Sequence, residues 1–315
     1  MSLGTISVQK LSLLLLFLMI IQLSSLAHSR KLMSLYEPPK VSLKYHHGVL
    51  LEGDLAVSIL WYGKFTPAQK SIISDFLVSL NAQKSGTDNV PSSNVPSVAK
   101  WWGMVQAYLR EAAKREARVT LGKQLMDEGC SMGRLLTRAQ VAKLAQKVNS
   151  GPHGLALVMT SDDVAVEDFC MGSCGFHGGD SAAFVWVGNS ATQCPGQCAW
   201  PFHQPIYGPQ VEPLGAPNGN VGADGMVINV ASLLAGAVTN PFGGGYFVGE
   251  AGALPLEAAS ACAGSYGKGA YPGYAGELLK DPTTGASYNA VGVNGRKYLL
   301  PALFDPATSQ CTTLV

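Results

Sequence analysis

The chain has 315 residues, with 22 basic and 21 acidic side chains and a formal net charge of +1. This balance excludes nucleic-acid binding through a basic surface, because no cationic excess is available to displace counterions. Charged residues make up 14% of the chain, against a typical ~25%, so the surface is unusually neutral. A hydrophobic content of 47% excludes a disordered chain, and the length suits one large domain or two ordinary ones.

The N-terminal residues have the pattern of a secretory signal peptide. Lys10 is the one charge before the apolar run Leu11–Leu23, and Ser25 and Ala27 are the small residues of a cleavage site. We predict cleavage after Ala27, with Ser29 as the alternative. The run is shorter than the ~20 apolar residues of a membrane span, so we expect a secreted chain without a membrane span. Loss of Lys10 leaves 21 basic and 21 acidic residues, a formal charge of zero.

Three segments follow from this pattern. Residues 1–27 are the predicted signal peptide, and residues 28–40 are a polar, basic leader that ends in Pro38-Pro39. Residues 41–315 are predicted to form a single large domain.

Taken in chain order, the apolar pattern of this domain alternates between strands and helices. Capping boxes, in which a Thr is followed three residues later by Gln, open two of the helices at Thr66 and Thr137. Asn294-Gly295 between two short runs is typical of a tight hairpin. The alternation predicts an α/β or α+β fold, with a mixed central sheet, flanking helices and Cys/Gly-rich loops. The predicted strands cover residues 55–62, 155–160 and 182–187, and the predicted helices cover 66–81, 98–118, 137–148 and 224–239.

Seven cysteines in a predicted secreted chain favour disulfides. We expect Cys262 to pair with Cys311, and Cys130 to be the odd thiol, because it lies in a polar stretch far from the others. Two further pairs, with members four residues apart, either close locally or cross. These are Cys170, Cys174, Cys194 and Cys198.

Zinc is the alternative for the same cluster. Cys170 and Cys174 followed by His177, and the later pair followed by His203, have spacings within the range of zinc ligands. Oxidation is favoured over metal binding in a secreted protein. We therefore expect neither a metal nor a cofactor.

The sequence contains no His-Glu-x-x-His, Gly-x-Ser-x-Gly, P-loop or dinucleotide-binding pattern. We therefore expect no enzymatic activity and no catalytic residue. The alternative is an extracellular hydrolase with a cleft around His177, His203, Glu212 and Asp224. Perturbed acidity at those residues would favour that alternative.

Tryptophan side chains suggest a second kind of site. Trp61, Trp101, Trp102, Trp186 and Trp200 could each stack on a sugar ring. Aromatic residues at strand and helix spacing are more often core residues. Carbohydrate binding is therefore one of two possible interactions, beside binding of an extracellular protein.

Eight blocks are spread along the mature chain, at Tyr45–Gly48, Ile59–Gly63, Gln69–Leu77, Glu167–Met171, Cys174–His177, Cys194–Phe202, Gly222–Met226 and Asn240–Gly243. Together they resemble the EXORDIUM, or phosphate-induced protein, family of plants. The resemblance implies a secreted apoplastic protein that promotes cell expansion and growth, in brassinosteroid-dependent regulation. It implies no established catalytic residue or ligand. Cys130 falls where the family pattern has no cysteine, which supports its assignment as the odd thiol.

One helix carries a further resemblance. The stretch that ends at Asn240-Pro241 is similar to helices of distant microbial relatives that carry a His-Glu zinc motif. Ser232 and Leu233 occupy the His-Glu positions here, and neither can supply a ligand or a general base. The resemblance implies a degenerate zincin-like scaffold whose metal site is lost. The alternative is a helix whose small residues simply allow close packing.

Overall fold

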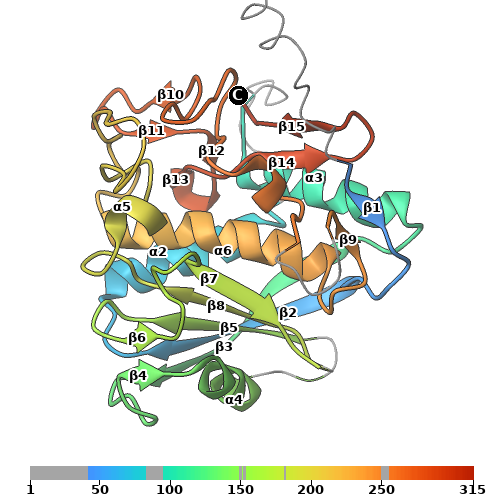
Figure 1. Cartoon of the computed structure of the whole chain (residues 1–315), viewed down its shortest axis with the longest axis vertical. Coiled ribbons are helices and arrows are strands. Elements are labelled where there is room, and N and C mark those ends of the chain that lie inside the picture. Colours follow the sequence, from blue (N-terminus) through green and yellow to red (C-terminus); the bar gives the residue numbers. More distant parts are fainter. Residues whose placement is uncertain (1–41, 83–94, 149–150, 152–153, 181, 250–254) are drawn as a thin grey trace, which may run out of the picture. The chain divides into compact units, whose positions relative to one another are not determined.

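The computed structural model describes residues 42–82, 95–148, 151, 154–180, 182–249 and 255–315. The predicted signal peptide with its Ala27 and Ser29 cleavage sites, and the leader 28–40, lie outside these residues. Residues Val41–Val315 form one compact unit. Its elements can be followed in Figure 1.

A five-stranded mixed sheet forms the centre of this unit, in the strand order β3-β2-β5-β8-β7. Neighbouring strands are parallel, except that the edge strand β7 runs antiparallel to β8. The expectation of a mixed sheet flanked by helices is therefore confirmed. The strands are β2 (Gly53–Tyr62), β3 (Ala117–Asp127), β5 (Gly154–Thr160), β7 (Gly175–Gly178) and β8 (Phe184–Gly188).

Side chains alternate between the two faces of this sheet, and both faces are covered. On β2, Val57 and Ile59 join one buried cluster, while Leu60 and Tyr62 join another. The period of two follows from the pleat of a strand. A strand buried on both faces reads as a continuous apolar run, which explains its clear signal in the sequence. The first cluster includes α2 (Pro67–Ser79), α3 (Val98–Glu111) and α6 (Val221–Thr239), and the second includes α4 (Arg138–Val148).

Both predicted capping boxes are confirmed. The Thr66 hydroxyl accepts a hydrogen bond from the Gln69 backbone N–H at 3.2 Å, and the Gln69 side chain accepts one from the Thr66 backbone N–H at 2.9 Å. Thr137 and Gln140 exchange the same two bonds at the start of α4. Each pair satisfies two backbone groups that a helix start otherwise leaves unpaired.

The prediction of one helix over residues 98–118 was wrong. The helix α3 ends at Glu111, and Ala113 then adopts a left-handed φ of 54°. The edge strand β3 follows from Ala117 and pairs with β2 along its length. Several outward-facing residues of β3 are exposed, so the strand lacks the apolar run that marks a buried strand.

The helix α6 crosses the middle of the fold (Figure 1). Asn220 caps it, accepting a hydrogen bond from the Ala223 backbone N–H at 2.9 Å. Among the described residues, α6 alone has the length and hydropathy of a membrane span. However, 78% of its apolar window is buried inside the protein, which is the environment of a core helix.

Short paired strands and turns make up most of the remaining chain. Asn294 and Gly295, with φ angles of 57° and 69°, lie in the connection between β12 and β13. The predicted hairpin therefore forms, although its connection is longer than two residues. The short elements are β1 (Lys44–Tyr45), β4 (Leu135–Leu136), β6 (Ala165–Val166), α5 (Pro195–Cys198), β9 (Tyr246–Phe247), β10 (Leu279–Lys280), β11 (Ser287–Tyr288), β12 (Ala290–Val291), β13 (Lys297–Tyr298), β14 (Leu303–Asp305) and β15 (Gln310–Thr312).

Six cysteines form three disulfides. The close pairs cross rather than close locally, as Cys170–Cys194 and Cys174–Cys198. Cys262 bonds to Cys311, and Cys130 is a buried free thiol. The crossed pairing leaves no thiolate for zinc at Cys170, Cys174, Cys194 or Cys198.

Candidate functional site

Two hollows contain the polar and aromatic groups that could contact a ligand. We call the first the polar pocket; it has a volume of about 330 Å³ and is lined by Asp75, Pro217, Asn218, Asp281, Asn294, Gly295, Arg296 and Lys297. The second, the aromatic groove, has a volume of about 550 Å³. Both volumes fall within the range of small-molecule sites.

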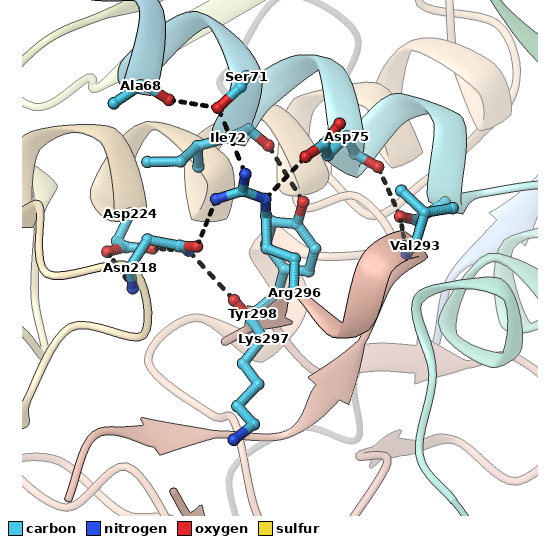
Figure 2. Close-up of polar contacts among 11 residues, drawn as sticks. Ala68, Ser71, Ile72, Asp75, Asn218, Asp224, Val293, Arg296, Lys297 and Tyr298 are labelled. Atoms are coloured by element: carbon cyan, nitrogen blue, oxygen red, sulfur yellow. Dashed lines mark hydrogen bonds and ion pairs between the residues drawn. The ribbon is translucent and has the colours of Figure 1, made fainter. Parts of the chain in front are cut away.

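Arg296 is the centre of the polar pocket (Figure 2). Its Nε donates to Asp75 Oδ2 at 2.9 Å, while Nη1 donates to Asn218 Oδ1 at 3.0 Å and Nη2 to Ser71 Oγ at 3.3 Å. These partners belong to α2 and to the loop before α6, so one guanidinium joins three segments distant in the sequence. Arginine suits this role because its donors are held in a rigid plane.

The second cation of the polar pocket is also paired. Lys297 donates a hydrogen bond to Asp281, and its ammonium lies 5.1 Å from the Tyr288 ring centroid. The Lys297 hydrogen bond and the Thr283 backbone N–H lower the pKa of Asp281. Two cations therefore face two carboxylates, so the pocket presents little net charge to a ligand.

A buried carboxyl lies behind this pocket. Asp224, in the first turn of α6, is 3% exposed. Burial raises its pKa to about 6, although hydrogen bonds from Asn218 and Asn220 act in the opposite direction. Asn218 donates to Asp224 Oδ1 at 2.6 Å and accepts from Arg296 (Figure 2). Chemically, Asp224 can hold a proton at mildly acidic pH, but Asn218 stands between it and Arg296.

The aromatic groove has a different lining. Trp200, Tyr207 and Tyr271 contribute rings, and Gln197 and Ser265 contribute neutral polar side chains. The remaining lining residues are Pro, Gly and Ala, so none of the lining residues is Asp, Glu, Lys, Arg or His. This arrangement can hold a molecule by ring contact and hydrogen bonding.

Two loops form the groove, and they touch each other closely. Gly273 has a left-handed φ of 90°, and a Cβ there would lie 2.7 Å from the Pro209 side chain. Trp200 packs on Tyr266, with ring centroids 5.7 Å apart. The two disulfides Cys174–Cys198 and Cys262–Cys311 fix the chain beside these loops.

The four residues of the proposed hydrolase cleft are not brought together. His177 lies on β7 and bonds to Glu257 Oε2 at 2.8 Å. Its ring contacts the position of Gly236, which lies 12 residues, or about 18 Å, along α6 from Asp224. His203 is exposed and bonds to the backbone of its neighbour Gln204. Glu212 is exposed in a loop, so these groups do not share one cleft.

Ser232 and Leu233 are half-buried on α6. The Ser232 hydroxyl donates back to the Ile228 carbonyl at 3.0 Å. Leu233 packs against Gly175 of β7: a Cβ added at Gly175 would lie 2.6 Å from the Leu233 Cδ1 atom. Across the described residues, no three His, Cys, Asp or Glu side chains converge as metal ligands would.

Comparison with known proteins identifies the family. The profile described as "Phosphate-induced protein 1 conserved region" matches residues 43–314. The chain belongs to the phosphate-induced protein 1 family. The match spans nearly the whole compact unit, including both hollows and all three disulfides.

Named members of the phosphate-induced protein 1 family are similar over most of their length. Protein PHOSPHATE-INDUCED 1 of Nicotiana tabacum is 56% identical over 299 residues, covering 91% of this chain and 93% of its own. Protein EXORDIUM of Arabidopsis thaliana is 54% identical, covering 96% and 98%. Protein EXORDIUM-like 1 of Arabidopsis thaliana is 54% identical, covering 87% and 90%. No solved structure matches the chain.

Sequence reasoning missed most residues of both hollows. Asp75, Asn218 and Arg296 are separated by more than 70 positions, so no local spacing joins them. Trp200 was singled out as a ring that could stack on a sugar, and it lines the aromatic groove, but Tyr207 and Tyr271 were not singled out. Their positions in Pro/Gly-rich loops, away from any strand or helix pattern, are the signal that would have found them.

Proposed function

We propose that this protein is secreted to the apoplast and promotes cell expansion by binding rather than by catalysis. The observation that carries the proposal is family membership over residues 43–314, together with the likeness to EXORDIUM. Three disulfides suit an oxidising compartment, and the N-terminal pattern suits secretion. The lining of the larger hollow, the aromatic groove, contains no Asp, Glu, Lys, Arg or His, which suits a binding site.

The proposal is tested by expression in plants. The full chain, and a chain lacking residues 1–27, are produced with the same C-terminal tag. We expect the full chain in the apoplastic wash, with its N-terminus after Ala27, and longer epidermal cells. The truncated chain should be retained and should leave cell length unchanged. Equal growth promotion by both chains would contradict apoplastic action.

The brassinosteroid dependence has its own test. Plants that lack the protein should elongate less in response to supplied brassinosteroid than plants that express it. An unchanged response, with the protein absent, would contradict this part of the proposal.

The second candidate function is an extracellular hydrolase that acts on wall polysaccharide or protein. The observation that favours it is Asp224, whose pKa burial raises to about 6 beside a pocket, as in many catalytic acids. Asp224→Asn decides between the two. If the protein acts by binding, the Asp224→Asn variant promotes growth as well as the unmodified protein when equal amounts are secreted. If it is a hydrolase that uses Asp224, the variant loses growth promotion.

The idea of a degenerate zincin-like scaffold also remains a proposal. It is supported by the position of α6 in the core, where Ser232 and Leu233 are half-buried. The side chains at those positions do not fit a zinc ion, because one is a helix-bonded hydroxyl and the other an alkyl group. A structure of a metal-binding relative with the same sheet order and helix position would test the shared scaffold.

A further inference from the structure

We propose that the aromatic groove binds a stretch of uncharged polysaccharide. This inference rests on the binding function proposed above and names its ligand class. Four properties of the groove carry it: the absence of charge, the exposure of its rings, its unpaired neutral polar groups and its fixed loops.

Charge is the first property. None of the residues lining the groove is Asp, Glu, Lys, Arg or His. A charged ligand would lose its hydration on entering, without gaining an opposite charge. An acidic pectin chain therefore fits the groove poorly, whereas a neutral glycan loses no charge solvation.

Exposed rings are the second property. Tyr207 is 87% exposed and Tyr271 is 64% exposed, and the third ring of the lining, Trp200, is half-buried. The chain's other four tryptophans are at most 2% exposed. A sugar ring presents a face of C–H groups that packs on an aromatic ring, so a cluster of exposed rings suits a glycan.

Unpaired polar groups are the third property. The side chains of Gln197 and Ser265 make no hydrogen bond within the described part of the chain, and neither do the hydroxyls of Tyr207 and Tyr271. These groups both donate and accept, as sugar hydroxyls do. A proline-rich peptide also fits aromatic grooves, but its prolines offer acceptors without donors.

Fixed loops are the fourth property. Tyr271 and Tyr274 pack together with ring centroids 5.1 Å apart, and Gly273 lies against Pro209 of the facing loop. The disulfides Cys174–Cys198 and Cys262–Cys311 anchor the chain beside both loops. Loops held in place before binding lose less conformational entropy when a ligand arrives.

Tryptophan fluorescence of the full mature chain provides the test, because Trp200 is the one tryptophan among the residues that line the groove. The neutral probes are cellohexaose and a xyloglucan heptasaccharide, and the contrasting probes are hexagalacturonate and a proline-rich decapeptide.

We expect a neutral probe to change the tryptophan emission, with a change that saturates as the probe concentration rises. Tyr207→Ala and Tyr271→Ala should each weaken binding at least tenfold, while Tyr271→Phe, which keeps the ring, stays within threefold. Leu135→Ala, at a 79% exposed position on β4, is the matched control and should bind normally.

Three outcomes would overturn the inference, and a fourth would reject the proposed function instead. If hexagalacturonate or the peptide bound more tightly than the neutral probes, the ligand class would be an acidic glycan or a peptide and not a neutral glycan. Binding of a neutral probe that Tyr207→Ala and Tyr271→Ala leave unchanged would place the glycan elsewhere. No binding of any probe, by a protein that still promotes cell expansion, would reject the groove but keep the proposed function. A protein that binds the neutral glycan but does not promote cell expansion would reject the proposed function instead.

Discussion

Asp224 gives the protein a residue-scale dependence on pH. Because its pKa is raised from 3.8 to about 6, the folded state holds the proton more tightly than the unfolded chain. This contribution to stability is fully present below about pH 4 and is lost as the pH rises through 6. A shift of this size corresponds to about 3 kcal/mol at most. We expect Asp224→Asn to reduce the fall in unfolding free energy between pH 4 and 7, measured by urea denaturation.

The matched control for Asp224 is Glu212→Gln, which removes an exposed carboxyl. Its pH profile should follow that of the unmodified protein. An Asp224→Asn profile as steep as the unmodified one would show that other groups cause the pH dependence.

Among the residues that line the polar pocket, we expect the loss of Arg296 to lower the free energy of unfolding the most. Lysine in its place keeps the charge but can reach only some of the partners Asp75, Asn218 and Ser71. The remaining partners are then left without a donor. We expect Arg296→Lys to lower the free energy of unfolding by about 2–3 kcal/mol, measured by urea denaturation. Arg115→Ala, which removes a 3.7 Å surface ion pair with Glu52, should cost less than about 1 kcal/mol; equal effects would contradict a special role for Arg296.

At the scale of the elements, two helix glycines should respond oppositely to alanine. A Cβ at Gly236 of α6 would lie 2.4 Å from Glu257 Oε2 and 2.9 Å from His177 Nε2, whereas a Cβ at Gly103 of α3 meets nothing within 4 Å. Alanine favours a helix by about 1 kcal/mol over glycine. We expect Gly103→Ala to stabilise by up to that amount, and Gly236→Ala to destabilise by about 1–3 kcal/mol. Thermal unfolding of both variants measures this, and a stabilising Gly236→Ala would mean that the His177–Glu257 pair moves freely.

Elements with a complete local signal could be predicted from the sequence, and elements without one could not. The capping boxes at Thr66 and Thr137 mark helix starts because the hydrogen bonds lie within four residues. The buried strand β2 is visible because both of its faces are apolar. The edge strand β3 has exposed polar positions, and β7 is only four residues long with Gly at both ends, so pairing across the sheet decides both.

The site is less predictable than the elements, for the same reason. Cys170, Cys174, Cys194 and Cys198 could be recognised as a cluster, but their crossed pairing depends on where β7 and α5 lie. Asp224 was recognised as a candidate, but its raised pKa depends on burial that only tertiary packing produces. The Arg296 guanidinium bonds to Asp75, Asn218 and Ser71, each at least 78 positions away in the sequence, so only the fold brings them together.

At the scale of the whole molecule, the oxidation state can be read from a mass measurement. Three disulfides lower the mass of the chain by about 6 Da relative to the reduced chain. Cys130 is buried, with 6% of its surface exposed, so we expect no alkylation of the native protein and one alkylated thiol after denaturation. Three or more alkylated thiols under denaturing, non-reducing conditions would contradict the disulfide assignment.

The crossed disulfides have a consequence for the lifetime of the chain. A protease cut anywhere between Cys174 and Cys194 would leave two fragments still joined by both bonds, because each bond spans the cut. A cut between Cys262 and Cys311 would likewise leave its fragments tied together. These two stretches contain β7, β8 and one loop of the aromatic groove. A molecule cut once in either stretch would therefore keep its pieces covalently linked, and gels run without reductant would show it at full size.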